Sequence, residues 1–346
     1  MKKTQHRDNA LTKWLRVLAC LSFMGAPTVC ANESLDADFG GFLFGDLYHV
    51  PSLHTFEGDS ASGAVLRRLL LTADSKFGDQ WSGRARLEAY HEGAFENYEM
   101  AHRILDLGVT KKLGDHRLSG GLIPTITYDV MEAFWGKRYL VRTAPDIQGI
   151  AARDVGLKLS GPLPVVGGLS YRVMHGSKAT WQADKNSFNK TMGGITWRGS
   201  TGLLVDAYMD WESRPGPYDR STVQFLVGKK TEQYTLGLEY THQDRGEDPD
   251  LELAALMGVM KLGGPWSVMA QLHRLFKPSV KGNDIAYIPF DPTAKATNLV
   301  AGVEYRFNSH FTVSPNIVWT HYGVNELGVK PDDDVHLRLT FYVNFE

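Results

Sequence analysis

Residues 201–212 read TGLLVDAYMDWE and alternate between apolar and polar side chains. Every second residue from Leu203 to Trp211 is apolar, and the other face carries Asp206, Asp210 and Glu212. A period of two residues is the pattern of a β-strand with one apolar face and one polar face. A helix would need its charges on one side of a 3.6-residue period. The stretch therefore predicts a strand of about ten residues, roughly twice the usual length in a soluble sandwich.

The same alternation recurs along the chain. It is found in residues 81–91, 234–241, 298–306 and 336–345. Strands of about ten residues, apolar on one face and polar on the other, are typical of transmembrane β-barrels. After the N-terminal region no segment has 18 apolar residues in succession, so we expect no membrane-spanning helix there. The sequence predicts an all-β fold, a transmembrane antiparallel β-barrel.

The N-terminal residues 1–31 have the layout of a secretory signal peptide. Basic residues precede an apolar stretch at 14–27, and Val29-Cys30-Ala31 ends with a small residue. A retained anchor is the alternative, but the stretch is short for a span of roughly 20 residues. We expect cleavage after Ala31, export to the outer membrane, and a single barrel domain at 32–346.

Cleavage would change the composition of the chain. Both cysteines, Cys20 and Cys30, would be lost, so we expect no disulfide, no thiolate nucleophile and no cysteine metal site. Five basic residues and one acidic residue would also go from totals of 37 and 39, leaving a net charge of −6. A mildly acidic chain is a poor partner for nucleic acid. The expected partners are outer-membrane lipids and small polar solutes or ions.

The connections between the alternating segments are short and long in turn. Short turns are expected at 77–80, 113–115, 162–164, 198–200, 229–231, 263–265 and 308–310, and glycine, aspartate, asparagine or proline marks all of them except 229–231. Longer polar connections lie at 50–63, 92–103, 125–152, 176–189, 213–220, 244–250, 277–296 and 322–334. This rhythm is typical of outer-membrane barrels with short periplasmic turns and long external loops. It predicts about sixteen strands between Phe39 and Phe345.

A barrel of about 16–18 strands is wide enough to leave an aqueous channel. We therefore expect passive diffusion of small polar solutes or ions. Two alternatives stay open: a barrel hydrolase acting on lipid or peptide, and a surface receptor or adhesin. The sequence has no nucleophile elbow, zinc-protease or nucleotide-binding motif, so we expect no catalytic residue, metal or cofactor.

The connection at 125–152 is the longest, and long connections in compact proteins are usually functional. We expect it to constrict the lumen. The candidate constriction residues are charged groups of this connection and of the strand at 81–91, namely Arg84, Arg86, Glu88, Lys137, Arg138, Arg142, Asp146, Arg153 and Asp154. The cations could attract anions. Alternatively, they could pair with Asp129, Glu132, Asp146 and Asp154 and hold the loop to the wall.

Two stretches carry a family resemblance. Residues 135–156, WGKRYLVRTAPDIQGIAARDVG, resemble the third-loop region of Gram-negative porins of the phosphate-selective porin (O and P) type. Residues 67–88, RRLLLTADSKFGDQWSGRARLE, are similar to the opening hairpin of that family. The resemblance implies a 16-stranded barrel, usually a homotrimer, with the third loop folded inward and with anions such as phosphate among its solutes.

Overall fold

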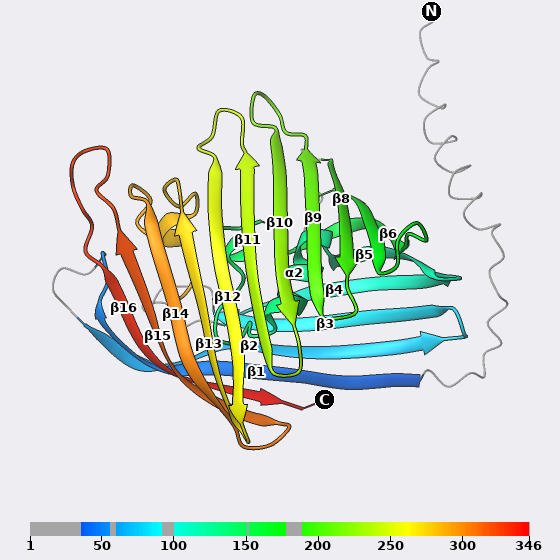
Figure 1. The fold of residues 1–346 in the computed structure, drawn as a ribbon, viewed down its shortest axis with the longest axis horizontal. Coiled ribbons are helices and arrows are strands. Elements are labelled where there is room, and N and C mark those ends of the chain that lie inside the picture. Colours follow the sequence, from blue (N-terminus) through cyan, green and yellow to red (C-terminus); the bar gives the residue numbers. More distant parts are fainter. Residues whose placement is uncertain (1–35, 56–59, 92–99, 151, 178–188, 346) are drawn as a thin grey trace, which may run out of the picture. The chain divides into compact units, whose positions relative to one another are not determined.

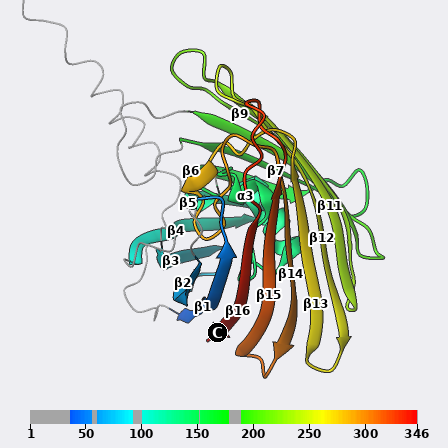
Figure 2. The same cartoon turned by 90° about the vertical axis from the view of Figure 1, so that its left-hand side faces the viewer.

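The computed structural model describes residues 36–55, 60–91, 100–150, 152–177 and 189–345. In this part of the chain, sixteen antiparallel strands form a closed barrel (Figure 1). Each strand pairs with its neighbours in sequence, and β1 pairs with β16 to close the ring (Figure 2). The predicted fold class and strand number are confirmed. The predicted signal peptide, 1–31, lies outside the described residues.

The elements follow the predicted segments closely. The strands are β1 (Asp36–Ser52), β2 (Ala61–Phe77), β3 (Trp81–His91), β4 (Met100–Leu113), β5 (His116–Pro124), β6 (Arg153–Pro162), β7 (Leu169–Gly176), β8 (Lys190–Arg198), β9 (Leu203–Glu212), β10 (Arg220–Lys230), β11 (Tyr234–Asp244), β12 (Leu251–Gly263), β13 (Trp266–Leu275), β14 (Ala296–Arg306), β15 (Phe311–Tyr322) and β16 (Asp334–Asn344). Within the described ranges there are also three short helical segments, α2 (Ile126–Trp135), α3 (Ala144–Ile147) and η1 (Gly282–Asp284). No helix in the described ranges is long and apolar enough to cross a membrane.

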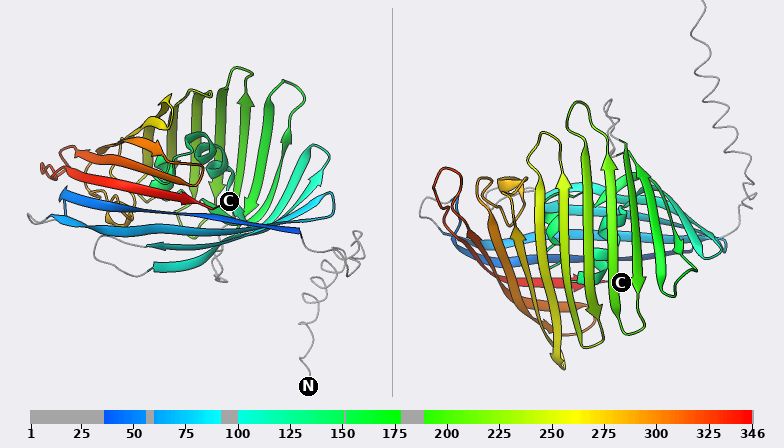
Figure 3. Two further views of the ribbon diagram at one scale, coloured as in Figure 1. Left: turned by 90° about the horizontal axis from the view of Figure 1, so that it is seen from below. Right: turned by 45° about the horizontal axis from the view of Figure 1, so that its top comes forward.

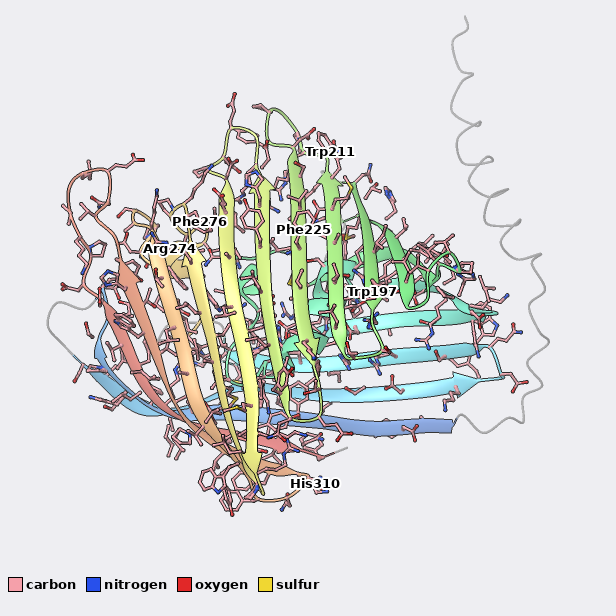
Figure 4. The ribbon with its side chains drawn as sticks, in the orientation of Figure 1. Trp197, Trp211, Phe225, Arg274, Phe276 and His310 are labelled. Atoms are coloured by element: carbon pink, nitrogen blue, oxygen red, sulfur yellow. The ribbon has the colours of Figure 1, made fainter. Side chains whose placement is uncertain are left out.

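The alternation in β9 separates two environments, as its sequence predicts. Met209 and Trp211 are 64% and 56% exposed on the outside of the barrel, whereas Asp206 and Asp210 are buried toward the lumen. Trp211 on β9 and Phe225 on β10 are labelled in Figure 4. Large apolar side chains thus cover the outer wall, which suits a lipid environment.

Turns and long connections lie at opposite ends of the strands. Several turns need a glycine with positive φ, and the β12–β13 turn has two, Gly263 at +106° and Gly264 at +55°. Such angles strain any residue with a Cβ atom. The predicted alternation of short and long connections is therefore confirmed. We call the two ends of the lumen the turn side and the loop side.

Two of the long connections fold into the barrel: 125–152 between β5 and β6, and 276–295 between β13 and β14. Figure 3 shows the helical part of the first, in green, inside the ring of strands. Its apolar side chains, among them Phe134, Trp135 and Leu140, pack in one buried cluster with the wall residues Leu226 and Met257. The apolar core of this protein therefore lies inside the lumen, between the first loop and the β8–β14 wall.

Candidate functional site

Helix α2 is fitted to the wall by two glycines that face its Phe134 ring. A Cβ atom at Gly228 would lie 2.2 Å from Phe134 Cζ, and one at Gly237 would lie 2.4 Å from Cε1. Lys230 Nζ donates to the carbonyls of Ala133 and Phe134 at 2.8 and 3.2 Å. A cation at the C-terminal end of a helix stabilises its unpaired carbonyls and its dipole. Wall and helix thus match in both shape and charge.

The segment after α2 crosses the lumen to other strands. Lys137 Nζ lies 2.5 Å from Glu304 Oε2 on β14, and the Tyr139 hydroxyl donates to the same oxygen. Arg67 on β2 donates to the carbonyls of Tyr139 and Leu140. The loop therefore bridges strands on the two sides of the β1–β16 closure, and its predicted inward fold is confirmed.

Arg138 organises the interior of the loop. It donates to Glu132 and Asp146, each at 2.7 Å, and Glu132 also accepts the Thr143 backbone N–H at 3.2 Å. Burial alone would raise the pKa of Asp146, but Arg138 and Arg142 outweigh it and lower this pKa to about 2. The carboxylate therefore stays ionised and fixes the turn between α2 and α3.

Two cavities lie in the lumen on the side that the loop leaves open, along β2–β6. The loop-side cavity, of about 370 Å³, reaches Tyr90 on β3 and Arg103 on β4. The turn-side cavity, of about 810 Å³, reaches Arg84 on β3 and Lys112 on β4. Arg86 and Glu88 lie between Arg84 and Tyr90 along β3, so these two residues lie on the wall between the two cavities.

A charged cluster lies between the two cavities, in what we call the narrow region. Asp106 accepts from Arg153 at 2.5 Å and lies 3.3 Å from Arg86. Glu88 pairs with Arg68 at 2.8 Å and with Arg103 at 2.7 Å. From the loop, the Tyr128 ring faces the cluster, with the Arg153 guanidinium 4.3 Å from its centroid. Two carboxylates on the wall are thus shared by four arginines.

The predicted site residues divide into two groups and three separate positions. Arg86, Glu88 and Arg153 meet at the narrow region, and Arg138, Arg142 and Asp146 meet inside the loop. The other three lie apart from both groups: Arg84 pairs with Asp74 at 2.6 Å in the turn-side cavity, Lys137 lies at the β14 wall, and Asp154 is buried on β6 against Gly176. The role of all nine in ion preference stays a prediction.

Loop 276–295 was not among the predicted constriction elements. Tyr287, with a left-handed φ of 67°, donates to the carbonyls of Arg67 and His91 at 3.2 and 2.7 Å. Arg338 donates to the carbonyl of Tyr287 at 2.5 Å. The signal for this fold was present, because residues 285–290, IAYIPF, are apolar within an otherwise polar connection. The predicted set also left out Arg67, Arg103 and Lys281, which line the loop-side cavity.

No family model matches the chain, and no curated protein matches it in sequence. Solved structures do match. An anion-selective porin from Comamonas acidovorans has a TM-score of 0.63 at 12% identity, covering 90% of this chain and 100% of that chain. The fold is that of outer-membrane porins. The outer membrane channel DcaP of Acinetobacter baumannii has a TM-score of 0.62 at 12% identity, covering 91% of this chain and 99% of that chain.

A third match bears on assembly. OmpT of Vibrio cholerae, folded in vitro and described as a trimer form, has a TM-score of 0.58 at 14% identity, covering 90% of this chain and 100% of that chain. At such identities the likeness to these porins concerns the fold.

Proposed function

We propose that the chain is an outer-membrane channel for passive diffusion of small anions, with loop 125–152 as its constriction. The observation that carries the proposal is the line of two cavities along β2–β6, with the Arg86–Asp106–Arg153 cluster between them. Loop 125–152 is packed on the opposite wall, which leaves this side of the lumen for solutes. The proposal assigns no catalytic residue.

The charge of the lining supports a preference for anions. Among the described residues, six arginine and lysine side chains line the loop-side cavity with one carboxylate, Asp284, and four of the six pair with carboxylates outside the lining. The turn-side cavity is closer to balance. Rings of charge at the narrow part of a pore determine which ions enter. The anion-selective porin with the same fold agrees with this preference, and the resemblance to phosphate-selective porins makes phosphate a solute to test.

We propose a homotrimer in the outer membrane as the working assembly. The apolar outer wall supports the location, and the trimer form of OmpT supports the assembly. Chemical cross-linking in detergent would test it, with a ladder ending at three subunits as the expected result.

The test of the channel is conductance in a planar bilayer, with reversal potential measured in a KCl gradient. We expect stepwise ohmic conductance and a reversal potential of the sign that shows chloride preference. A purified, folded barrel without conductance would exclude the channel. Turnover of a lipid or peptide in detergent would instead support a hydrolase, and a receptor or adhesin would neither conduct nor turn over substrate.

A further inference from the structure

The loop-side cavity lies where the two inward-folded loops meet. Loop 125–152 contributes Arg138, Val141, Arg142 and Ile147 to its lining. Loop 276–295 contributes residues 281 and 284–288, and the remaining lining comes from β1–β4. Its volume of about 370 Å³ is at the lower end of the range for small-molecule sites. The cavity is therefore a chamber of defined size between two loops and a wall.

Four of the six cations in this chamber already have carboxylate partners. Arg67 pairs with Asp46 at 2.9 Å, and Arg68, Arg103 and Arg138 pair with carboxylates in the same way. These pairs fix the guanidinium groups in place but satisfy much of their charge. These four arginines therefore form a fixed part of the cavity wall and are not the principal anion-binding groups.

The other two cations, Arg142 and Lys281, come one from each loop. Within the described ranges, neither makes a hydrogen bond or an ion pair through its side chain. Burial is the main cause that lowers the pKa of both, and nearby Asp146 opposes it at each. The positive charge of Arg142 lowers the pKa of Lys281 further, so the two cations repel each other. An anion placed between them would relieve this repulsion, and a carboxylate can accept hydrogen bonds from both.

The remaining lining includes a set of apolar side chains beside Tyr90, His91, Asp284 and Tyr287. Phe44, Val141, Ile147, Ile285 and Ile288 are each at most 6% exposed. Burying an apolar body against such residues gains free energy in proportion to its area. Inorganic phosphate would lose water on this side of the chamber without that compensation.

The arginines also present flat faces next to aromatic rings. The guanidinium of Arg67 lies 5.0 Å from the centroid of Phe44, and that of Arg103 lies 4.4 Å from the centroid of Tyr90. Guanidinium planes and tyrosine rings stack well on a further flat ring. The lining therefore favours a planar body over an aliphatic chain of the same size.

We propose that the loop-side cavity is a binding site for a small aromatic carboxylate. Arg142 and Lys281 hold the carboxylate, and the apolar and arginine walls hold the ring. The inference rests on the proposed channel function, since it names the solute class of the same lumen. Bound solute would leave toward the turn side past Arg86 and Asp106.

Calorimetric titration of the folded full-length protein in detergent tests the site without conductance. The probes are benzoate, benzamide, acetate and inorganic phosphate at equal ionic strength. Benzamide keeps the ring without the charge, and acetate keeps the charge without the ring. We expect saturable 1:1 binding of benzoate, at least about tenfold tighter than that of each other probe. Phosphate binding as tightly as benzoate, or no saturable benzoate binding, would overturn the proposal.

Two variants locate the site, one on each loop. Arg142→Gln and Lys281→Gln should each weaken benzoate binding about tenfold. The control is Arg274→Gln, since Arg274 lies on β13, is labelled in Figure 4, and is absent from the cavity lining. Weakening by Arg274→Gln but not by the two loop variants would place the site elsewhere and overturn the proposal.

Benzoate should also reduce chloride current through the reconstituted protein in a saturable way. A protein that conducts but does not bind benzoate refutes the site and leaves the channel standing. A protein that binds benzoate but does not conduct refutes the channel and leaves the site standing.

Discussion

Lys137 and Glu304 are 167 residues apart in the sequence, yet Lys137 Nζ lies 2.5 Å from Glu304 Oε2. Glu304 is only 1% exposed, and the Tyr139 hydroxyl donates to the same carboxylate. The pair joins the constriction loop to the wall opposite the open lumen. Breaking a buried pair by removing one charge leaves the other without compensation, which is costly.

Glu304→Gln should therefore lower the free energy of unfolding by about 1–3 kcal/mol, measured by chemical denaturation in detergent. Arg306→Gln is the matched control, because Arg306 is the exposed partner of Glu304, with its side chain 55% accessible and 3.4 Å away. Arg306→Gln should lower the free energy of unfolding by less than about 1 kcal/mol. Equal losses in the two variants would show that the buried pair does not anchor the loop.

Gly228→Ala should displace Phe134, because its Cβ would lie 2.2 Å from the ring. We expect a loss of about 1–3 kcal/mol in unfolding free energy. Gly193→Ala on β8 is the control, since a Cβ there meets no atom within 4 Å. In a Phe134→Ala background the Gly228→Ala loss should largely vanish; additive losses would contradict the contact.

Arg86→Ala should lower the anion-to-cation permeability ratio about twofold or more, read from the reversal potential in a KCl gradient. Arg86 lies at the narrow region beside Asp106. Arg84→Ala should change the ratio less, because Arg84 pairs with Asp74 in the wider cavity and its side chain is 47% exposed. A larger effect at Arg84 would move the selectivity region toward the turn side.

The low pKa of Asp146, about 2, predicts how its contribution depends on pH. A carboxyl group whose pKa is lowered on folding contributes stability above its unfolded value near 4. That contribution is lost as the pH falls through the folded pKa. The difference in unfolding free energy between the wild type and Asp146→Asn should thus be constant from pH 7 to 5 and shrink from about pH 4 toward 2.

Asp248→Asn is the control for this prediction, since Asp248 lies in a connection outside both cavities and its side chain is 39% exposed. The unfolding free energy of Asp248→Asn should differ from that of the wild type by less than about 1 kcal/mol from pH 7 to pH 2. A difference for Asp146→Asn that vanishes by pH 5 would show that Arg138 does not hold the carboxylate ionised.

Most of the barrel could be predicted because apolar and polar residues alternate within each strand and so identify its outer and inner faces. Asp206 and Trp211 differ in environment for a reason visible within six residues of sequence. No local sequence pattern shows where the loop packs against the wall. Nothing near Phe134 indicates that Gly228 and Gly237 receive its ring, because the contact depends on the closed ring of strands.

The same reason explains why the candidate residues lie at separate positions and why other lining residues were left out. Lys137 was expected at the constriction together with Arg138, but adjacent residues of a loop point to different walls once the loop is folded. Lys281 lies in a connection that reads as polar at its start, and only the apolar residues 285–290 distinguish it from an exposed loop.

The contacts that anchor loop 125–152 to the wall affect the order in which the protein folds. Its anchors include Arg67 on the second strand and Glu304 on the fourteenth, so the loop cannot complete its contacts until nearly the whole chain has been added. Contacts of such long sequence separation form late in folding. We therefore expect the strands of the wall to pair before the loop completes its contacts, so that the constriction forms last.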